Sequence, residues 1–152
     1  MSAQIPNTPF VSSHSSYERT WAALAHGCAL LVLAGGVGGI IAALVIWLTQ
    51  KEKSAWAAFH ALQSLVFQAA TLIITVLVVG VVWVLGFGFS FATVGFGTLV
   101  AVPVMILVFF GAFAIMGAGM IYSLYGAIQV YQGRDFRYIW IGDWVYRRFS
   151  AR

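Results

Sequence analysis

The chain has 152 residues, of which 62% are hydrophobic and 8% are charged, and its formal net charge is +4. Soluble domains carry about 25% charged residues, so this composition excludes an ordinary soluble fold. The single cysteine, Cys28, excludes an intrachain disulfide and a cysteine-based metal site. The length gives room for one domain, and the small basic excess lies mostly at the C-terminal end, which argues against nucleic acid as a partner.

The N-terminal residues 1–16 are rich in Ser, Pro and Asn, which predicts a flexible arm with His14 in solvent. No Lys or Arg precedes Arg19, so we do not expect a cleaved signal peptide. A helix is expected from Tyr17, with Ser15 or Ser16 as its N-cap and Glu18 in its first turn.

The stretch from Thr20 to Gln50 is uncharged and contains the sequence GGVGG at 35–39. It is compatible with one long tilted helix over Trp21–Leu48 or with a helical hairpin that turns at the glycines. The hairpin would have arms 17–34 and 40–50. We favour it because it places His26 in the same leaflet as the polar residues of the later helices.

Two long apolar runs lie inside a segment, from Lys53 to Arg134, that carries no fixed charge between its ends. They are Leu65–Leu85 and Leu99–Tyr122, and each exceeds the roughly 20 residues that a helix needs to cross a bilayer. The sequence therefore predicts an all-α membrane protein, with a lipid bilayer as its first partner.

The ends of these two spans follow from local signals. Ser54 is expected to cap a helix that begins at Ala55 and crosses the membrane to Leu85. Residues 86–97, GFGFSFATVGFG, are expected to lie at the interface as a glycine-rich loop. The last span is expected from Thr98 to about Gln132 and to stop at Gly133, with Pro103 in its first turn or at a kink.

The C-terminal tail, residues 134–152, mixes arginines with aromatic residues, which is typical of a segment anchored at the membrane interface. Asp143 and Arg147 have the spacing of a helical ion pair. The expected anchors are Arg134, Arg137, Trp140, Trp144, Arg147 and Arg148.

Charge placement predicts the orientation. The tail has five Arg and two Asp, or +3, and the loop at 51–53 has two Lys and one Glu, or +1. Two spans separate these segments, so both lie on the same side, and the positive-inside rule makes that side cytoplasmic. We therefore expect a multi-pass protein of the bacterial inner (plasma) membrane with both termini in the cytoplasm.

Polar residues inside the apolar helices recur at helical spacing, which places them on single helix faces. The predicted stripes are His60, Ser64, Gln68, Thr71 and Thr75 on one helix and Tyr122, Tyr125, Gln129 and Gln132 on the other. The simplest interpretation is that they hydrogen-bond helices to one another. A second interpretation is a polar groove for a bound or translocated ligand.

A third interpretation of the polar residues is axial ligation of haem or a chlorophyll-type pigment by His26 or His60. Ala22, one turn before His26, would let a flat ring approach. Otherwise we expect no cofactor. Gly119, Ser123 and Ala127, each four apart, are expected to form a close-packing helix face.

No catalytic constellation is apparent, and we expect neither an enzyme nor a metal site. The acids are Glu18, Glu52, Asp135 and Asp143, all expected at or outside the interface. No Ser/His/Asp arrangement, phosphate loop or metal-spaced cluster accompanies them.

Three segments carry a family resemblance: YERTWAALAH at 17–26, IWLTQKEKSAWAAFHALQSLVFQ at 46–68 and YGAIQVYQGRDFRYIWIGDWV at 125–145. They resemble a small bacterial membrane-protein family of unknown function that is related to the channel-type subunit of the chloroplast inner-envelope protein translocon. Members of that family typically have Pro directly after the tyrosine that corresponds to Tyr138, where this chain has Ile139. The resemblance implies a four-helix membrane unit, favours the hairpin, and brings no catalytic residue.

These observations predict a flexible arm (1–16), a transmembrane helical domain of four helical segments (17–133) and an interfacial tail (134–152). The leading functional hypothesis is a non-enzymatic accessory, assembly or stabilising subunit that packs against larger membrane proteins. A translocation or channel component is the second hypothesis, and a pigment-binding subunit is the third.

Overall fold

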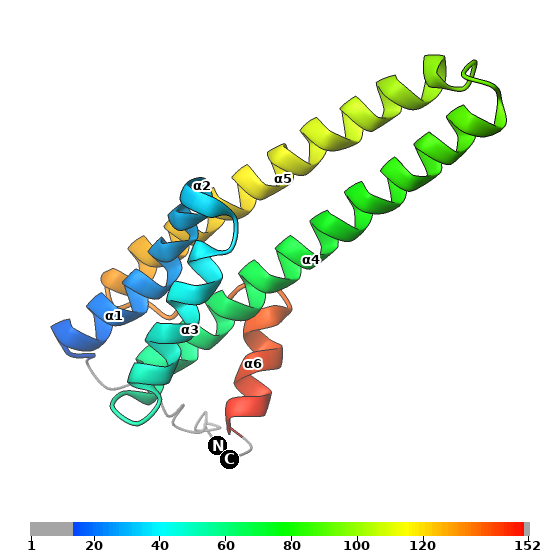
Figure 1. Ribbon diagram of the computed structural model, residues 1–152. Coiled ribbons are helices and arrows are strands. Elements are labelled where there is room, and N and C mark those ends of the chain that lie inside the picture. The colour runs from blue at the N-terminus through cyan, green and yellow to red at the C-terminus, as the bar shows by residue number, and fades with distance from the viewer. Residues whose placement is uncertain (1–13, 151–152) are drawn as a thin grey trace, which may run out of the picture. The chain divides into compact units, whose positions relative to one another are not determined.

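The computed structural model describes residues 14–150, so the expected flexible arm lies almost entirely outside the described residues. Within this range the chain is helical and contains no strand (Figure 1), as expected for an all-α membrane protein. The elements are α1 (Ser16–Gly27), the 3₁₀ helix η1 (Cys28–Leu31), α2 (Val32–Gly35), α3 (Gly38–Gln50), α4 (Ala55–Ala92), α5 (Thr98–Tyr131) and α6 (Ile141–Ser150).

The helices form two compact units. One combines the described chain up to residue 66 with residues 123–150, and we call it the polar-core unit. The other consists of residues 67–122, and we call it the hairpin unit. The polar-core unit contains α1 to α3, the first turns of α4, the last turns of α5, and α6. The hairpin unit contains the antiparallel remainder of α4 and α5 (Figure 1).

The first helix begins as its sequence predicts. The Ser15 side chain accepts a hydrogen bond from the Glu18 amide, and the Glu18 carboxylate accepts one from the Ser15 amide at 2.9 Å. This reciprocal capping box satisfies two amides that the first turn leaves without helical partners.

The apolar block after α1 is a hairpin, and the alternative of one long helix is wrong. The helix breaks at Gly36, whose φ of +63° places it in a conformation that residues with a Cβ rarely adopt. The chain then returns in α3, which packs against η1 and α1. Gly38 makes the close return possible, since an added Cβ would lie 3.1 Å from the Leu31 carbonyl oxygen.

Helix α4 begins at Ala55, as expected, with Ser54 capping it by accepting from the Ala57 amide at 3.2 Å. Its end differs from the prediction, because residues 86–92 continue the helix where we expected an interfacial loop. A backbone in apolar surroundings must bond its own polar groups, and the helix does this even through glycines. The turn is confined to residues 93–97, where Val94 and Gly95 have φ of +53° and +91°.

Helix α5 begins at Thr98 and ends at Tyr131, and Gly133 follows with φ of +80°, as predicted for the last span. Pro103 lies in the helix interior and not in its first turn. Both α4 and α5 are long and apolar enough to cross a membrane.

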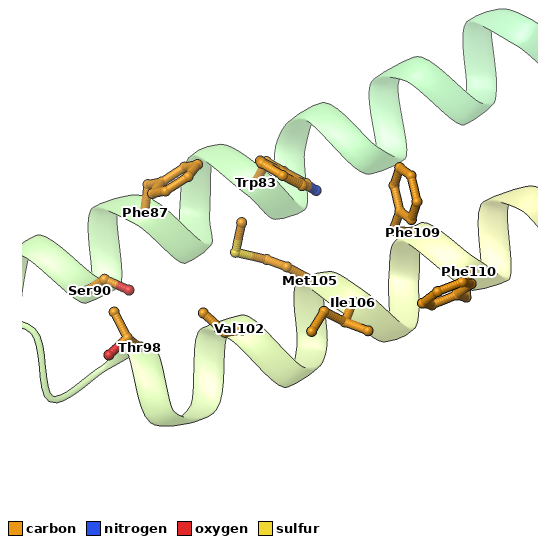
Figure 2. A pocket seen from close by; sticks show the side chains of 9 residues that line it. All are labelled: Trp83, Phe87, Ser90, Thr98, Val102, Met105, Ile106, Phe109 and Phe110. Carbon is orange, nitrogen blue, oxygen red and sulfur yellow. The ribbon is translucent and has the colours of Figure 1, made fainter.

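Within the hairpin unit, α4 and α5 approach closely where a glycine faces a methionine. A Cβ on Gly86 would lie 2.7 Å from the Met105 sulfur. Figure 2 shows Met105 extending from α5 toward Trp83 and Phe87 of α4. These side chains belong to the lining of an almost wholly apolar groove of about 500 Å³. The groove in this unit is therefore lined mainly by apolar side chains.

Candidate functional site

The candidate site is a cluster of buried polar side chains in the polar-core unit. Its centre is a pair of histidines, His26 from α1 and His60 from α4, both with no exposed surface. The Nε2 atom of His26 lies 3.2 Å from the Nδ1 atom of His60. The expectation that His26 joins the polar residues of the later helix is confirmed.

Gln63 determines where the proton of His60 lies. Its side-chain amide group donates to the Phe136 carbonyl at 2.8 Å, and its carbonyl oxygen accepts from the Tyr138 amide at 3.4 Å. These backbone partners fix the orientation of the amide. The same nitrogen of Gln63 lies 2.8 Å from His60 Nδ1, so this ring nitrogen accepts and the His60 proton resides on Nε2.

The tautomer of His26 follows from that of His60. Because His60 Nδ1 carries no proton, His26 must present a proton on its Nε2 atom at the 3.2 Å contact. Its Nδ1 atom lies 2.9 Å from the Tyr138 hydroxyl. The Ser123 hydroxyl, 2.8 Å from that of Tyr138, extends the chain to α5. These hydrogen bonds are formed by neutral side chains.

Within residues 14–150, the Nε2 atom of His60 has no hydrogen-bond partner. The Asp135 carboxylate is 3.9 Å from it, which exceeds hydrogen-bond distance. Aromatic rings pack around the same imidazole, with Trp56 at 4.5 Å and Phe59 at 5.3 Å between ring centroids. His14, which we expected in solvent, is half-buried, and its ring stacks on Trp56 at 3.9 Å between centroids.

Protein groups surround the ring nitrogens of both histidines. Both ring nitrogens of His26 are within hydrogen-bond distance of protein groups. The remaining nitrogen of His60 is fully enclosed and bordered by aromatic rings. Ala22, which we expected to admit a flat ring, has no exposed surface.

The predicted stripe on α4 is divided between the two units. His60 and Ser64 are buried in the polar-core unit, where the Ser64 hydroxyl donates to the Ala25 carbonyl at 2.6 Å. Gln68, Thr71 and Thr75 lie in the hairpin unit and are half-buried. The Thr71 hydroxyl donates to the Phe67 carbonyl of its own helix at 2.8 Å.

The residues of the predicted stripe on α5 have different surroundings. Tyr122 belongs to the hairpin unit, where its ring lies 6.1 Å from that of Phe67. Tyr125 is 53% exposed, and Gln129 accepts a hydrogen bond from Arg134 at 3.2 Å. Gln132 follows the end of α5 and is exposed.

Of the expected close-packing face, Gly119, Ser123 and Ala127, an added Cβ on Gly119 would lie 3.5 Å from the Phe67 ring. Ser123 is buried, but the tightest approach is at Gly126, where an added Cβ would lie 2.5 Å from the Phe136 ring. Phe136 and Tyr138, which we expected at headgroup depth, are buried at 7% and 1% exposure. The tail therefore supplies part of the core.

Sequence reasoning missed Gln63, Ser123 and Tyr138 as members of the cluster. Two signals were available. Gln63 lies three residues after His60 on the same helix face, and Tyr138 closes a Gly-x-x-Phe-x-Tyr pattern that begins at Gly133. His26 and Tyr138 are 112 positions apart in the sequence. The spacing of polar residues along a single helix cannot predict a contact between such distant residues.

The predicted interface anchors fall into two groups. Arg137 pairs with Asp135 at 3.1 Å and with Asp143 at 3.5 Å, and it lies over the Tyr146 ring. The expected pairing of Asp143 with Arg147 is therefore replaced by pairing with Arg137. The exposed anchors are Arg134, Trp140, Trp144, Arg147 and Arg148.

Among the described residues, no group of three or more His, Cys, Asp and Glu side chains is placed to hold a metal ion. The buried thiol of Cys28 lies near the carbonyls of Ala25 and Gly39, at 3.0 and 3.2 Å. The chemistry that the cluster offers is therefore hydrogen bonding between helices.

A family model described as the magnetosome magnetite crystal formation protein family matches residues 17–145. The chain belongs to this family. The matched range contains His26, Gln63, Tyr138 and the rest of the cluster. No curated protein and no solved structure matches the chain. The expectation of a small membrane-protein family is supported, whereas the relation to the translocon subunit stays a prediction.

Proposed function

We propose that this chain is a non-enzymatic integral membrane component that serves magnetite crystal formation by packing against other membrane proteins. The observation that carries the proposal is an exposed small-residue face on α5, formed by Gly111, Ala114 and Ala118. Their spacings of three and four place them on one helix face. Small residues let transmembrane helices approach closely, which makes such faces contact sites.

The buried cluster supports a structural role. Its hydrogen bonds connect α1, α4, α5 and the segment before α6 to one another. Such a network specifies one arrangement of helices, because each buried partner is costly to leave unpaired. A polar-core unit held in one arrangement, and continuous in the chain with two long apolar helices, suits a protein that positions neighbouring membrane proteins.

We also propose that the C-terminus is cytoplasmic and that the turn at 93–97 faces the opposite compartment. The basis is the excess of Arg in the tail. Reporter fusions after Arg152 and within the turn test this orientation independently of the partner question. An extracytoplasmic signal from the first fusion would reverse it.

The test of the proposal is isolation of the full chain in mild detergent from cells that form magnetite. We expect the wild type to co-migrate with a larger membrane assembly. Ala114→Leu should release the chain from that assembly and reduce crystal formation in cells that carry only the variant. Ala92→Leu, at an exposed alanine near the end of α4, is the matched control and should change neither.

Two results would contradict the proposal. In the first, Ala114→Leu and wild type co-migrate with the same assembly and support the same crystals. In the second, the purified chain forms an oligomer of itself that conducts ions or peptides across liposomes, which is the outcome that a translocation component predicts.

A further inference from the structure

The outer side of α6 carries a basic and aromatic surface that the buried cluster does not use. Trp140 is 86% exposed, Trp144 is 49% exposed, and Arg147 and Arg148 are exposed as well. Trp144 lies three and four residues before Arg147 and Arg148, so these side chains share one side of α6. Trp140 precedes the helix and lines the same pocket as Trp144 and Arg147. The opposite side carries Val145, which is fully buried.

The backbone at Trp140, on this surface, has an unfavourable conformation. Its φ is +64°, a left-handed conformation that residues with a Cβ rarely adopt. The turn is tied to the buried core because the Gly142 amide donates to the Tyr138 carbonyl at 2.8 Å. Strained, exposed aromatic residues of this kind concentrate at binding sites.

The charges of the tail are distributed unevenly. Both of its carboxylates, Asp135 and Asp143, pair with Arg137. In the described part of the chain, Arg147 and Arg148 have no carboxylate within ion-pair distance. Arg148 lies over the Trp144 ring at 5.8 Å, which keeps its charge on this side of α6. The two arginines therefore give this surface a positive charge that no ion pair among the described residues neutralises.

A pocket of about 440 Å³ opens on this surface, lined by Val66, Trp140, Ile141, Trp144 and Arg147. Its volume is within the range of small-ligand sites. Val66 belongs to the start of the long apolar run of α4, where a membrane helix passes from headgroups to hydrocarbon. The pocket thus offers an arginine for a phosphate and apolar side chains for the carbon atoms attached to it.

We propose that this pocket binds an anionic phospholipid of the surrounding membrane, with Arg147 at the phosphate and Trp144 and Trp140 beside the glycerol region. Charge complementarity favours an anionic headgroup, and the apolar lining favours a lipid over free phosphate. This inference goes beyond the proposed function, since it concerns the lipid and not a protein partner.

The test is native mass spectrometry of the full-length protein in detergent with added phosphatidylglycerol or phosphatidylcholine. The wild type should retain phosphatidylglycerol in preference. Arg147→Gln should weaken this retention about fivefold, the factor that corresponds to one arginine at an anionic surface. Arg134→Gln is the matched control, since it removes an equal charge from an exposed residue of the same tail, and it should reduce retention less than about twofold.

Three outcomes would overturn the inference. Equal losses in Arg147→Gln and Arg134→Gln would indicate diffuse electrostatic attraction without a site. Equal retention of the two lipids by the wild type would exclude anionic selectivity. Displacement of the lipid by millimolar inorganic phosphate would indicate a site for the free anion. Circular dichroism of both variants should match the wild type, because both substitutions are at exposed positions.

Discussion

The two units of this protein distribute polarity in opposite ways. In the polar-core unit, His26, His60 and Gln63 have no exposed surface and bond to one another. In the hairpin unit, large apolar side chains such as Val84 and Phe91 are 72% and 83% exposed. Helix α4 takes part in both, with its polar residues buried at one end and its apolar residues facing outward at the other.

This difference shows that the units depend on different interactions. The hairpin needs length, apolar side chains and helical hydrogen bonds, all of which tolerate many substitutions in lipid. The polar-core unit needs specific partners at specific distances, because a buried polar group without its partner costs about 1–3 kcal/mol. This contrast predicts that substitutions of similar size will change the free energy of unfolding more in the polar-core unit than in the hairpin unit.

The largest expected effect follows the removal of His26. His26→Ala leaves the Tyr138 hydroxyl and His60 without one partner each, so we expect a loss of about 3 kcal/mol in the free energy of unfolding. Thr71→Ala removes a hydroxyl that bonds only its own helix, and it should change stability by less than about 0.5 kcal/mol. Unfolding in mixed micelles, followed by tryptophan fluorescence, measures both. Similar losses in the two variants would contradict the contrast.

A smaller difference in the free energy of unfolding is expected between alanine substitutions at two glycines of α5. Gly126→Ala forces a Cβ to 2.5 Å from the buried Phe136 ring, which should cost about 1–3 kcal/mol. Gly117→Ala meets no atom within 4 Å and should be neutral or stabilising by up to about 1 kcal/mol, since alanine favours the helix. Thermal unfolding of the two variants in one detergent compares them. A loss at Gly117 equal to that at Gly126 would show that both units are packed alike.

The smallest expected effect is a pH dependence of the polar-core unit. The backbone hydrogen bond from Ser15 and the side-chain hydrogen bond from Ser54 hold the pKa of Glu18 below its ordinary value of 4.5. A lowered folded pKa means that the stabilisation is present above pH 4.5 and is lost as the pH falls through the folded pKa. Solvent screening keeps the effect to about 0.5 kcal/mol.

Glu18→Gln separates titration of this carboxylate from other acid effects. Gln can still accept at the cap but does not titrate, so the variant should lose the step in stability below pH 4.5 while the wild type keeps it. Melting temperatures between pH 3 and pH 7 provide the measurement. An unchanged acid step in the variant would assign it to another carboxylate.

Much of the fold could be predicted from local patterns. Ser15 with Glu18 and Ser54 before Ala55 marked two helix starts, and Gly133 marked the end of α5. The glycines at 35–39 permitted a hairpin, which the structure confirms. The error at residues 86–92 had a physical cause, because glycine weakens a helix in water but cannot release backbone groups into lipid.

The sequence by itself determined the two long apolar helices, because uncharged runs longer than 20 residues have few stable alternatives to a membrane helix. It also determined the membrane class and the capped helix starts. Only the tertiary structure decided which polar residues meet. Ser64 joins the core while Thr75 does not, and the tail returns Phe136 and Tyr138 to α1 and α4. Such contacts depend on packing between distant segments, which helical periodicity does not encode.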